Sequence, residues 1–127
     1  MSEITLVFGA SLKPERYSNV AIGKLVDNGL DVKAFGLKPG TVGGVEIDTE
    51  LKSYKNIDTV TLYLNPQRQK DYYSYILSLN PKRVIFNPGT ENQELYNLLI
   101  ENNIKVEVAC TLVLLATNQY ANYSEKE

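Results

Sequence analysis

Residues 4–19 read ITLVFGASLKPERYSN, and this stretch decides the fold. Its first part, residues 4–8, is a continuous apolar run, which is typical of a strand buried on both faces. The run ends at Gly9, and beyond Ser18 apolar residues recur at helical spacing until Gly29. A strand that ends at a glycine and leads through a loop into a helix is the usual setting for a phosphate group.

The rest of the chain repeats this alternation of apolar runs and helical patterns. Strands are predicted at residues 31–35, 41–47 (a turn and a short edge strand), 58–64, 83–86 and 105–109. Helices are predicted after an N-cap at Ser18, at residues 50–55 and 67–79, after a capping box of Thr90 with Gln93, and from Thr111. We therefore expect an α/β protein: a three-layer Rossmann-like fold, with a mostly parallel five- or six-stranded sheet and helices on both faces.

Length and composition fit one soluble domain. The 127 residues predict a single domain at residues 1–120, with a frayed C-terminal tail at residues 121–127. The net charge of -2 argues against nucleic acid or a membrane as a general partner, and no apolar run is long enough to span a bilayer. With no histidine and only Cys110, the chain has no internal disulfide and no metal site rich in nitrogen or sulfur. This cysteine usage favours the cytoplasm.

The loop after the first strand has the residues of an anion site. Gly9 lets the backbone approach a ligand, Ser11 offers a hydroxyl, and Arg16 carries a planar fork suited to phosphate. Ser18 stands where the helix opens, beside free N–H groups and the positive end of the helix dipole. The alternative interpretation is a plain turn, an N-cap and a solvated arginine.

The same loop argues against NAD as the ligand. A dinucleotide fingerprint needs glycines where this chain has Ser11 and Pro14, and it needs a carboxylate at the end of the second strand. That strand ends in Phe35-Gly36-Leu37-Lys38, which suits an adenine ring and an extra phosphate better than a ribose diol. NADP stays open at this point, whereas residues 13–16 break the pattern of a flavin phosphate loop.

The motif G-A-S-x-x-P-x-R-Y-S-N, followed by N-P at residues 65–66 and N-P-G at residues 87–89, resembles the CoA-binding domain family. The resemblance covers residues 4–119 and extends to the nucleotide-binding domain of the succinyl-CoA synthetase α subunit. It implies that CoA lies across the carboxyl ends of the strands. Three groups of residues are implied as its binding site: Gly9, Ala10, Ser11, Arg16 and Ser18 at the phosphates; Gly36, Leu37 and Lys38 at the 3′-phosphate end; and Asn65 and Pro66 at the adenine or ribose, with Asn87, Pro88 and Gly89 along the pantetheine path.

The sequence therefore predicts a protein that binds CoA or an acyl-CoA and has no catalytic residues of its own. The alternative is an NADP-binding oxidoreductase domain or subunit, for which neither a substrate-binding extension nor a proton donor is visible. Cys110 has two interpretations: it forms a mixed disulfide with the CoA thiol, or it is a small buried apolar residue. A homodimer or a partner enzyme stays open, since the tyrosine-rich residues 71–79 suit an interface as well as the core.

Overall fold

The sheet of this computed structural model, which describes residues 3–121, has seven strands in the order β3-β4-β2-β1-β5-β6-β7. The strands are β1 (Ile4–Ala10), β2 (Asp31–Gly36), β3 (Gly40–Val42), β4 (Val45–Asp48), β5 (Ile57–Leu62), β6 (Arg83–Phe86) and β7 (Lys105–Val108). Every neighbouring pair is parallel except β3 with β4. The α/β fold with a mostly parallel sheet is confirmed.

The strand count exceeds the predicted five or six because residues 40–48 form a hairpin rather than one short strand. Gly43 and Gly44 connect β3 to β4, with φ of 56° and 82°. Two positive φ values in a two-residue loop suit the twist of an antiparallel pair, and glycine adopts them without strain. The hairpin adds β4 beside β2 and leaves β3 at the edge of the sheet.

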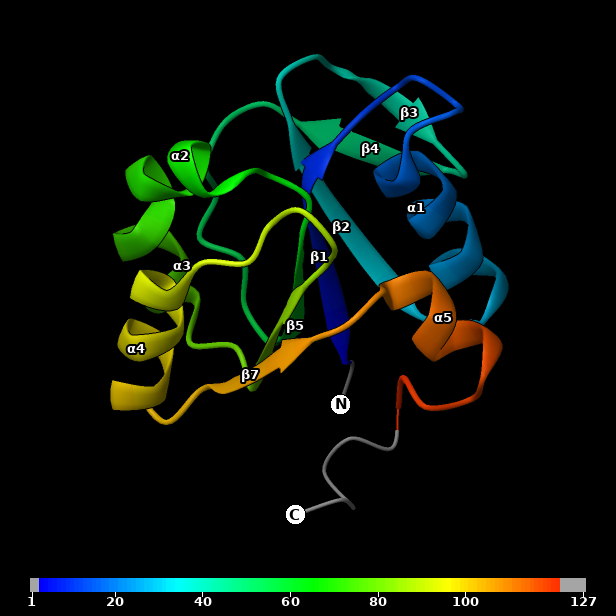
Figure 1. The fold of residues 1–127 in the computed structure, drawn as a ribbon. Helices are drawn as coiled ribbons and strands as arrows, with labels where there is room; N and C mark the ends of the chain where they lie inside the picture. Colours follow the sequence, from blue (N-terminus) through cyan, green and yellow to red (C-terminus); the bar gives the residue numbers. More distant parts are fainter. Residues whose placement is uncertain (1–2, 122–127) are drawn as a thin grey trace.

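Helices cover both faces of the sheet (Figure 1). α1 (Tyr17–Asp27) and α5 (Thr111–Ala116) pack on one face, while α2 (Pro66–Gln69), α3 (Tyr73–Leu79) and α4 (Gln93–Glu101) lie on the other. Alternation along β1 feeds both layers: Leu6 and Phe8 join the core under α3 and α4, and Val7 joins the core under α1 and α5. Three layers with helices on both faces are thus confirmed.

Two predicted helix caps were wrong. Arg16 is the N-cap of α1, and Ser18 is buried inside the helix. Thr90 donates its hydroxyl to the carbonyl of Asn87, and Asn92 caps α4 instead.

Two predicted helices also differ from the structure. Residues 67–79 form α2 and α3 with a 3₁₀ turn, η1 (Lys70–Tyr72), between them rather than one continuous helix. Residues 50–55 form no helix. Instead, Tyr75 and Tyr54 hold this segment through hydrogen bonds to the Lys52 carbonyl and the Asp48 carboxylate.

The end of β1 is shaped by two glycines. Gly9 has a φ of +105°, and the register between β1 and β2 shifts between Phe8 and Ala10. Ala10 then pairs with Gly36, where a Cβ atom would stand 2.3 Å from the Ala10 carbonyl oxygen. Only a residue without a side chain therefore allows β2 to approach β1 this closely at its carboxyl end.

The chain order makes this end of β1 the switch point of the sheet. β1 lies between β2 and β5. The chain leaves β1 toward β2 through α1, and it later continues from β5 toward β6 on the opposite side. Loops that diverge in this way open a crevice at the carboxyl ends of the two central strands, where α/β proteins bind their ligands.

Two remaining predictions concern the chain ends and membranes. The predicted tail at residues 121–127 lies, beyond residue 121, outside the described residues. Within residues 3–121, no helix has the length and apolar character that a membrane crossing requires.

Replacing Gly36 by alanine should lower the free energy of unfolding by about 1–3 kcal/mol, because the new methyl group collides with backbone rather than with a movable side chain. Gly23→Ala is the matched control. Gly23 lies inside α1 with nothing within 4 Å of its would-be Cβ, so alanine should stabilise the protein by about 0.5–1 kcal/mol. Urea unfolding measures both variants. Equal stability of Gly36→Ala and the wild type would contradict the close approach of β1 and β2.

Candidate functional site

A groove of about 400 Å³ opens at the carboxyl ends of β1, β2 and β5, at the switch point of the sheet. Its volume is within the range of small-molecule sites. The lining comes from the loop after β1, the end of β2, the segment after β5, and the first turns of α2 and η1. It consists of Gly9, Ala10, Ser11, Leu12, Lys13, Arg16, Phe35, Gly36, Leu37, Lys38, Tyr63, Leu64, Arg68 and Tyr72.

The groove brings together two of the three residue groups that the sequence suggested. From the first loop come Gly9, Ala10, Ser11 and Arg16, and from the end of β2 come Gly36, Leu37 and Lys38. These residues lie far apart in the sequence and meet because β1 and β2 are adjacent and parallel. The remaining predicted residues do not line the groove: Ser18, Asn65, Pro66, Asn87, Pro88 and Gly89.

Three of those residues have structural roles that the sequence motif did not separate from binding. Ser18 is only 4% exposed within α1. Asn65 is the N-cap of α2, where its side-chain oxygen accepts a hydrogen bond from the N–H of Arg68. Pro66 fills the first position of that helix, where a proline costs no hydrogen bond.

Asn87 is fully committed to the framework beneath the groove. Its Nδ2 donates to Thr61 Oγ1 at 2.7 Å and to the Leu62 carbonyl at 2.8 Å. Its Oδ1 accepts the N–H of Thr111 at 2.8 Å, which anchors the start of α5 to β5. A buried amide that has made three hydrogen bonds has little left for a ligand. Pro88 and Gly89 are exposed in the turn that follows.

Sequence reasoning missed Arg68 and Tyr72, which form the wall opposite the first loop. Both depend on how residues 66–72 fold. Asn65 and Pro66 start a helical turn that presents Arg68, and the 3₁₀ turn η1 then ends at Tyr72. The Asn-Pro helix start was the available signal for Arg68, since a side chain in the first helical turn lies near the loop that precedes it.

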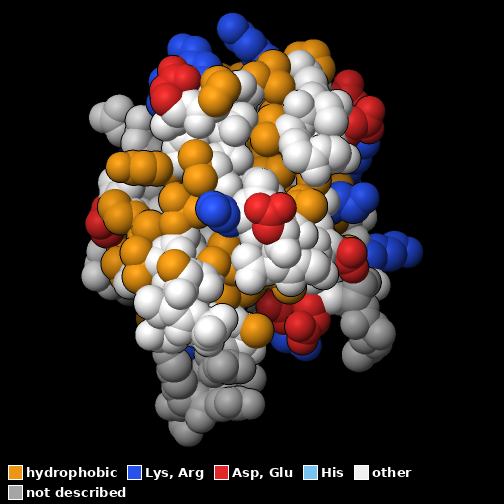
Figure 2. Space-filling view, turned by 90° about the vertical axis from the view of Figure 1, so that its right-hand side faces the viewer, with side chains coloured by type: hydrophobic (Ala, Val, Ile, Leu, Met, Phe, Trp, Pro, Cys, Tyr) orange, Lys and Arg blue, Asp and Glu red, His pale blue; other side chains and the backbone are white. Residues whose placement is uncertain are grey.

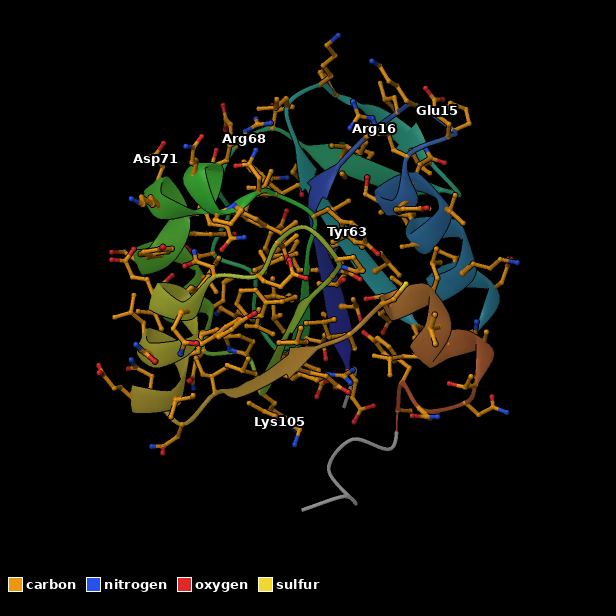
Figure 3. The ribbon with its side chains drawn as sticks, viewed as in Figure 1. Glu15, Arg16, Tyr63, Arg68, Asp71 and Lys105 are labelled. Carbon is orange, nitrogen blue, oxygen red and sulfur yellow. The ribbon has the colours of Figure 1, made fainter. Side chains whose placement is uncertain are left out.

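Four cations surround the groove: Lys13, Arg16, Lys38 and Arg68. No Asp or Glu belongs to the lining, and within residues 3–121 none of these four side chains pairs with a carboxylate. Figure 3 shows Arg16 on the α1 side and Arg68 on the α2 side of the end of β1. Like charges held together without counter-ions produce a positive potential, which favours an anionic ligand with more than one charge.

The first loop is fixed in place by contacts with its neighbours. The Ser11 carbonyl accepts a hydrogen bond from Asn19 Nδ2 at 2.9 Å, and Ser11 Oγ accepts one from the N–H of Lys13 at 3.1 Å. The side chain of Leu12 lies over Gly40 so closely that a Cβ there would be 2.4 Å from Leu12 Cδ2. These contacts hold the loop against α1 and the start of β3.

Beside the cations, the groove offers an apolar floor. Phe35 stacks on Phe8 with ring centroids 4.9 Å apart, and the Tyr72 ring meets Phe35 edge-on at 5.7 Å. Leu64 is nearly buried next to them, and Leu37 is 68% exposed at the rim. A surface that combines flat aromatic groups with nearby cations suits a ligand that has both a planar ring and phosphates.

Tyr63 contributes a neutral hydroxyl to the site. Burial raises the pKa of Tyr63 to about 12, although hydrogen bonds with Thr61 and Thr111 favour the ionised form. At neutral pH the phenol therefore stays protonated and acts as a hydrogen-bond partner rather than a general base. Figure 3 places Tyr63 below the level of Arg16 and Arg68.

The described part of the chain offers no candidate metal-binding site. Residues 3–121 contain no group of three or more His, Cys, Asp or Glu side chains that could hold a metal ion. Cys110 is half-buried at the N-cap of α5 and does not line the groove. The charged side chains of the lining are Lys13, Arg16, Lys38 and Arg68.

Comparison with known proteins identifies the family and supports the fold. The CoA binding domain family matches residues 3–116. A crystal structure of an uncharacterized protein is 46% identical, with a TM-score of 0.90 over 94% of this chain and 98% of that chain. A hypothetical protein from Pyrococcus horikoshii OT3 is 27% identical, with a TM-score of 0.75 over 98% and 82% of the two chains. A Thermus thermophilus protein, 22% identical with a TM-score of 0.81 over 93% and 90%, shares the fold. No curated protein matches the chain.

Tyr63→Phe should reduce the loss of stability at alkaline pH. Folding raises the pKa of Tyr63 from 10.0 to about 12. The contribution of the phenol to the free energy of unfolding is therefore complete below pH 10. It is lost as the pH approaches 12, because the unfolded state ionises first. The advantage of the wild type over the variant should shrink by about 2 kcal/mol across this window, as measured by urea unfolding. Tyr17→Phe, which alters an exposed ring, should follow the wild type. A pH-independent difference for Tyr63→Phe would contradict the burial of this phenol.

Proposed function

This chain belongs to the CoA-binding domain family, and from that premise we propose that it binds CoA or an acyl-CoA in the groove at the switch point. One observation carries the proposal: four cations without a carboxylate surround an apolar floor in the groove. CoA combines an adenine ring with a diphosphate and a 3′-phosphate, so its charge and shape match both parts of this lining.

The diphosphate lies in this proposal against the loop after β1. Gly9, Ala10 and Ser11 present backbone there, and Arg16 supplies a forked cation. α1 follows the loop directly, and its N-cap Arg16 makes no side-chain capping bond. The N–H groups of the first turn and the positive end of the helix dipole therefore support an anion at the same place.

The 3′-phosphate lies in this proposal near Lys38, beyond the end of β2. Gly36 and Leu37 precede Lys38 in the lining, and no carboxylate stands where a ribose diol of NAD would need one. Arg68 on the facing wall adds a second cation within the groove. Selectivity for a 3′-phosphorylated nucleotide follows from these two charges.

The adenine ring lies in this proposal over Phe35, whose ring is already held by Phe8 and Tyr72. Asn65 and Pro66 stand at the start of α2 next to Leu64 but outside the lining, so Arg68 and Tyr72 take the place of the wall on that side in this proposal. Pantetheine then runs toward the turn at residues 87–89. Because the Asn87 side chain is occupied, the exposed Pro88 and Gly89 provide the contacts along this path.

We propose binding without chemistry as the role of this chain. Tyr63 is neutral at physiological pH, and the groove has neither a carboxylate nor a cysteine. General acid–base catalysis and covalent catalysis both need such a group near the reacting atom. The protein would then hold, carry or sense CoA in the cytoplasm.

Calorimetric titration with CoA, dephospho-CoA, NADP and NAD tests the ligand. CoA should bind best, and dephospho-CoA should bind about tenfold more weakly because the 3′-phosphate is missing. In Lys38→Ala this preference should shrink, since one of the two cations proposed for the 3′-phosphate is gone. Lys55→Ala, an exposed lysine outside the groove, is the matched control and should keep the full preference. NADP binding equal to or tighter than CoA would overturn the proposal in favour of an oxidoreductase domain.

Arg16→Ala should weaken CoA binding by about ten- to a hundredfold, the scale of one charge-assisted hydrogen bond. The unfolding free energy should change little, because Arg16 is exposed and only its backbone participates in the start of α1. Lys24→Ala removes a cation from the other end of α1 and controls for net charge. Unchanged CoA affinity in Arg16→Ala would remove the first loop from the site.

A further inference from the structure

The outer edge of β7 is an open strand edge. β7 is the last strand in the sheet order, so within residues 3–121 no strand pairs with its outer side. Val108 at its end is 56% exposed. Open edges carry unpaired N–H and C=O groups that another strand can extend, and proteins usually cover them or block them.

The hydrogen bonds on the inner side of β7 show which groups point outward. The N–H of Lys105 donates to the Lys82 carbonyl at 3.0 Å, and the N–H of Ala109 donates to the Phe86 carbonyl at 3.2 Å. Residues 105, 107 and 109 therefore face β6, because successive peptide groups alternate along a strand. The N–H and C=O groups of Val106 and the N–H of Val108 face away from the sheet.

The side chains of β7 separate by chemical type. Lys105 and Glu107 share one face, on which Arg83 donates from its NH1 group to Glu107 Oε1 at 3.0 Å. Lys105 stands opposite Arg83 in the register of β6 and β7, and within residues 3–121 it makes no ion pair. Val106 packs against the core on the other face. Figure 3 shows Lys105 at the lower end of β7, pointing away from the body of the molecule.

We propose that two copies of this chain pair through β7, antiparallel and centred on Val106. In that register Val106 lies opposite Val106 of the second copy, and the two exchange both backbone hydrogen bonds. The N–H of Val108 meets the carbonyl of Ile104 of the second copy, and the reverse contact forms by symmetry. The two seven-stranded sheets then become one continuous sheet.

Charge selects this register. With the two-fold axis at Val106, Lys105 faces Glu107 of the second copy on the same side of the sheet. Two symmetry-related Lys–Glu ion pairs therefore form. Moving the axis to Val108 would keep the outward backbone groups in register but would place Glu107 opposite Ala109. Moving it to Glu107 would also keep the outward groups in register, because Val106 would then meet Val108, but it would place Glu107 opposite Glu107 of the second copy, where like charges repel. Only the Val106 register satisfies both the backbone and the charges.

Apolar cover adds to the pairing. Val108 comes to lie opposite Ile104 of the second copy, which covers a side chain that is more than half exposed in the single chain. Val113, on α5 shortly after β7, is also 57% exposed. Figure 2 views the side that carries α1 and α5 and shows hydrophobic side chains gathered there. The groove lies at β1, β2 and β5, away from β7, so both copies keep an open site.

Analytical ultracentrifugation of the full chain tests the assembly. The wild type should sediment at micromolar concentration with twice the 14.3 kDa mass of one chain. Lys105→Glu should raise the dissociation constant at least about tenfold, because it replaces two attractive pairs by two repulsive ones. Lys55→Glu makes the same charge change outside the interface and should leave the dimer intact. A wild type that stays monomeric, or a dimer that Lys105→Glu does not weaken, would overturn the proposal.

Amide hydrogen exchange identifies the interface independently. The amides of Val106 and Val108 should be protected in the wild type and should exchange freely in Lys105→Glu, while the amide of Lys105 stays protected in both. Val108→Lys, which places a charge against Ile104 of the second copy, gives a second route to the monomer, with Leu51→Lys as its exposed control. A dimer in which Val106 and Val108 exchange freely would use another surface and would refute pairing through β7.

Discussion

The structure depends on the contact between the backbones of β1 and β2 at their carboxyl ends. There is room for one hydrogen atom between Gly36 and the Ala10 carbonyl, and Gly9 reaches this point through a φ of +105°. The resulting shift in register directs the chain out of the sheet toward α1 instead of prolonging the strand. The groove, its first loop and the placement of Lys38 beside that loop all follow from this contact.

The sequence predicted the layout well where burial on both faces leaves long apolar runs. The strands β1, β5 and β6 are buried along most of their length and are present as predicted, and so are β2 and β7, in which polar residues alternate with apolar ones. Helix starts were harder to predict. Ser18 and Thr90 have good capping side chains, but in the structure burial and the turn at residues 87–89 decide where α1 and α4 begin. The hairpin at residues 40–48 was predicted as a turn and one strand, whereas Gly43-Gly44 is a turn between two strands.

The residues of the candidate site also fall into two groups, those that the sequence predicted and those that it did not. Residues that follow β1 and β2 directly in the sequence line the groove, because their position depends only on parallel pairing. Arg68 and Tyr72 were not foreseen, since their place depends on the 3₁₀ turn that interrupts residues 66–79. Asn87 looked like a ligand residue in the sequence motif, yet its amide is bonded to Thr61, Leu62 and Thr111. A motif alone does not separate framework from binding surface.

The contact between Leu12 and Gly40 gives the edge hairpin an influence beyond its size. Gly40 begins β3, an outermost strand of the sheet, yet it supports the loop that carries Lys13 and Arg16. The position of this loop, and with it the width of the groove, therefore depends on Gly40, which does not itself line the groove. Substitutions in the edge hairpin can therefore alter ligand affinity without replacing any of the four cations of the groove.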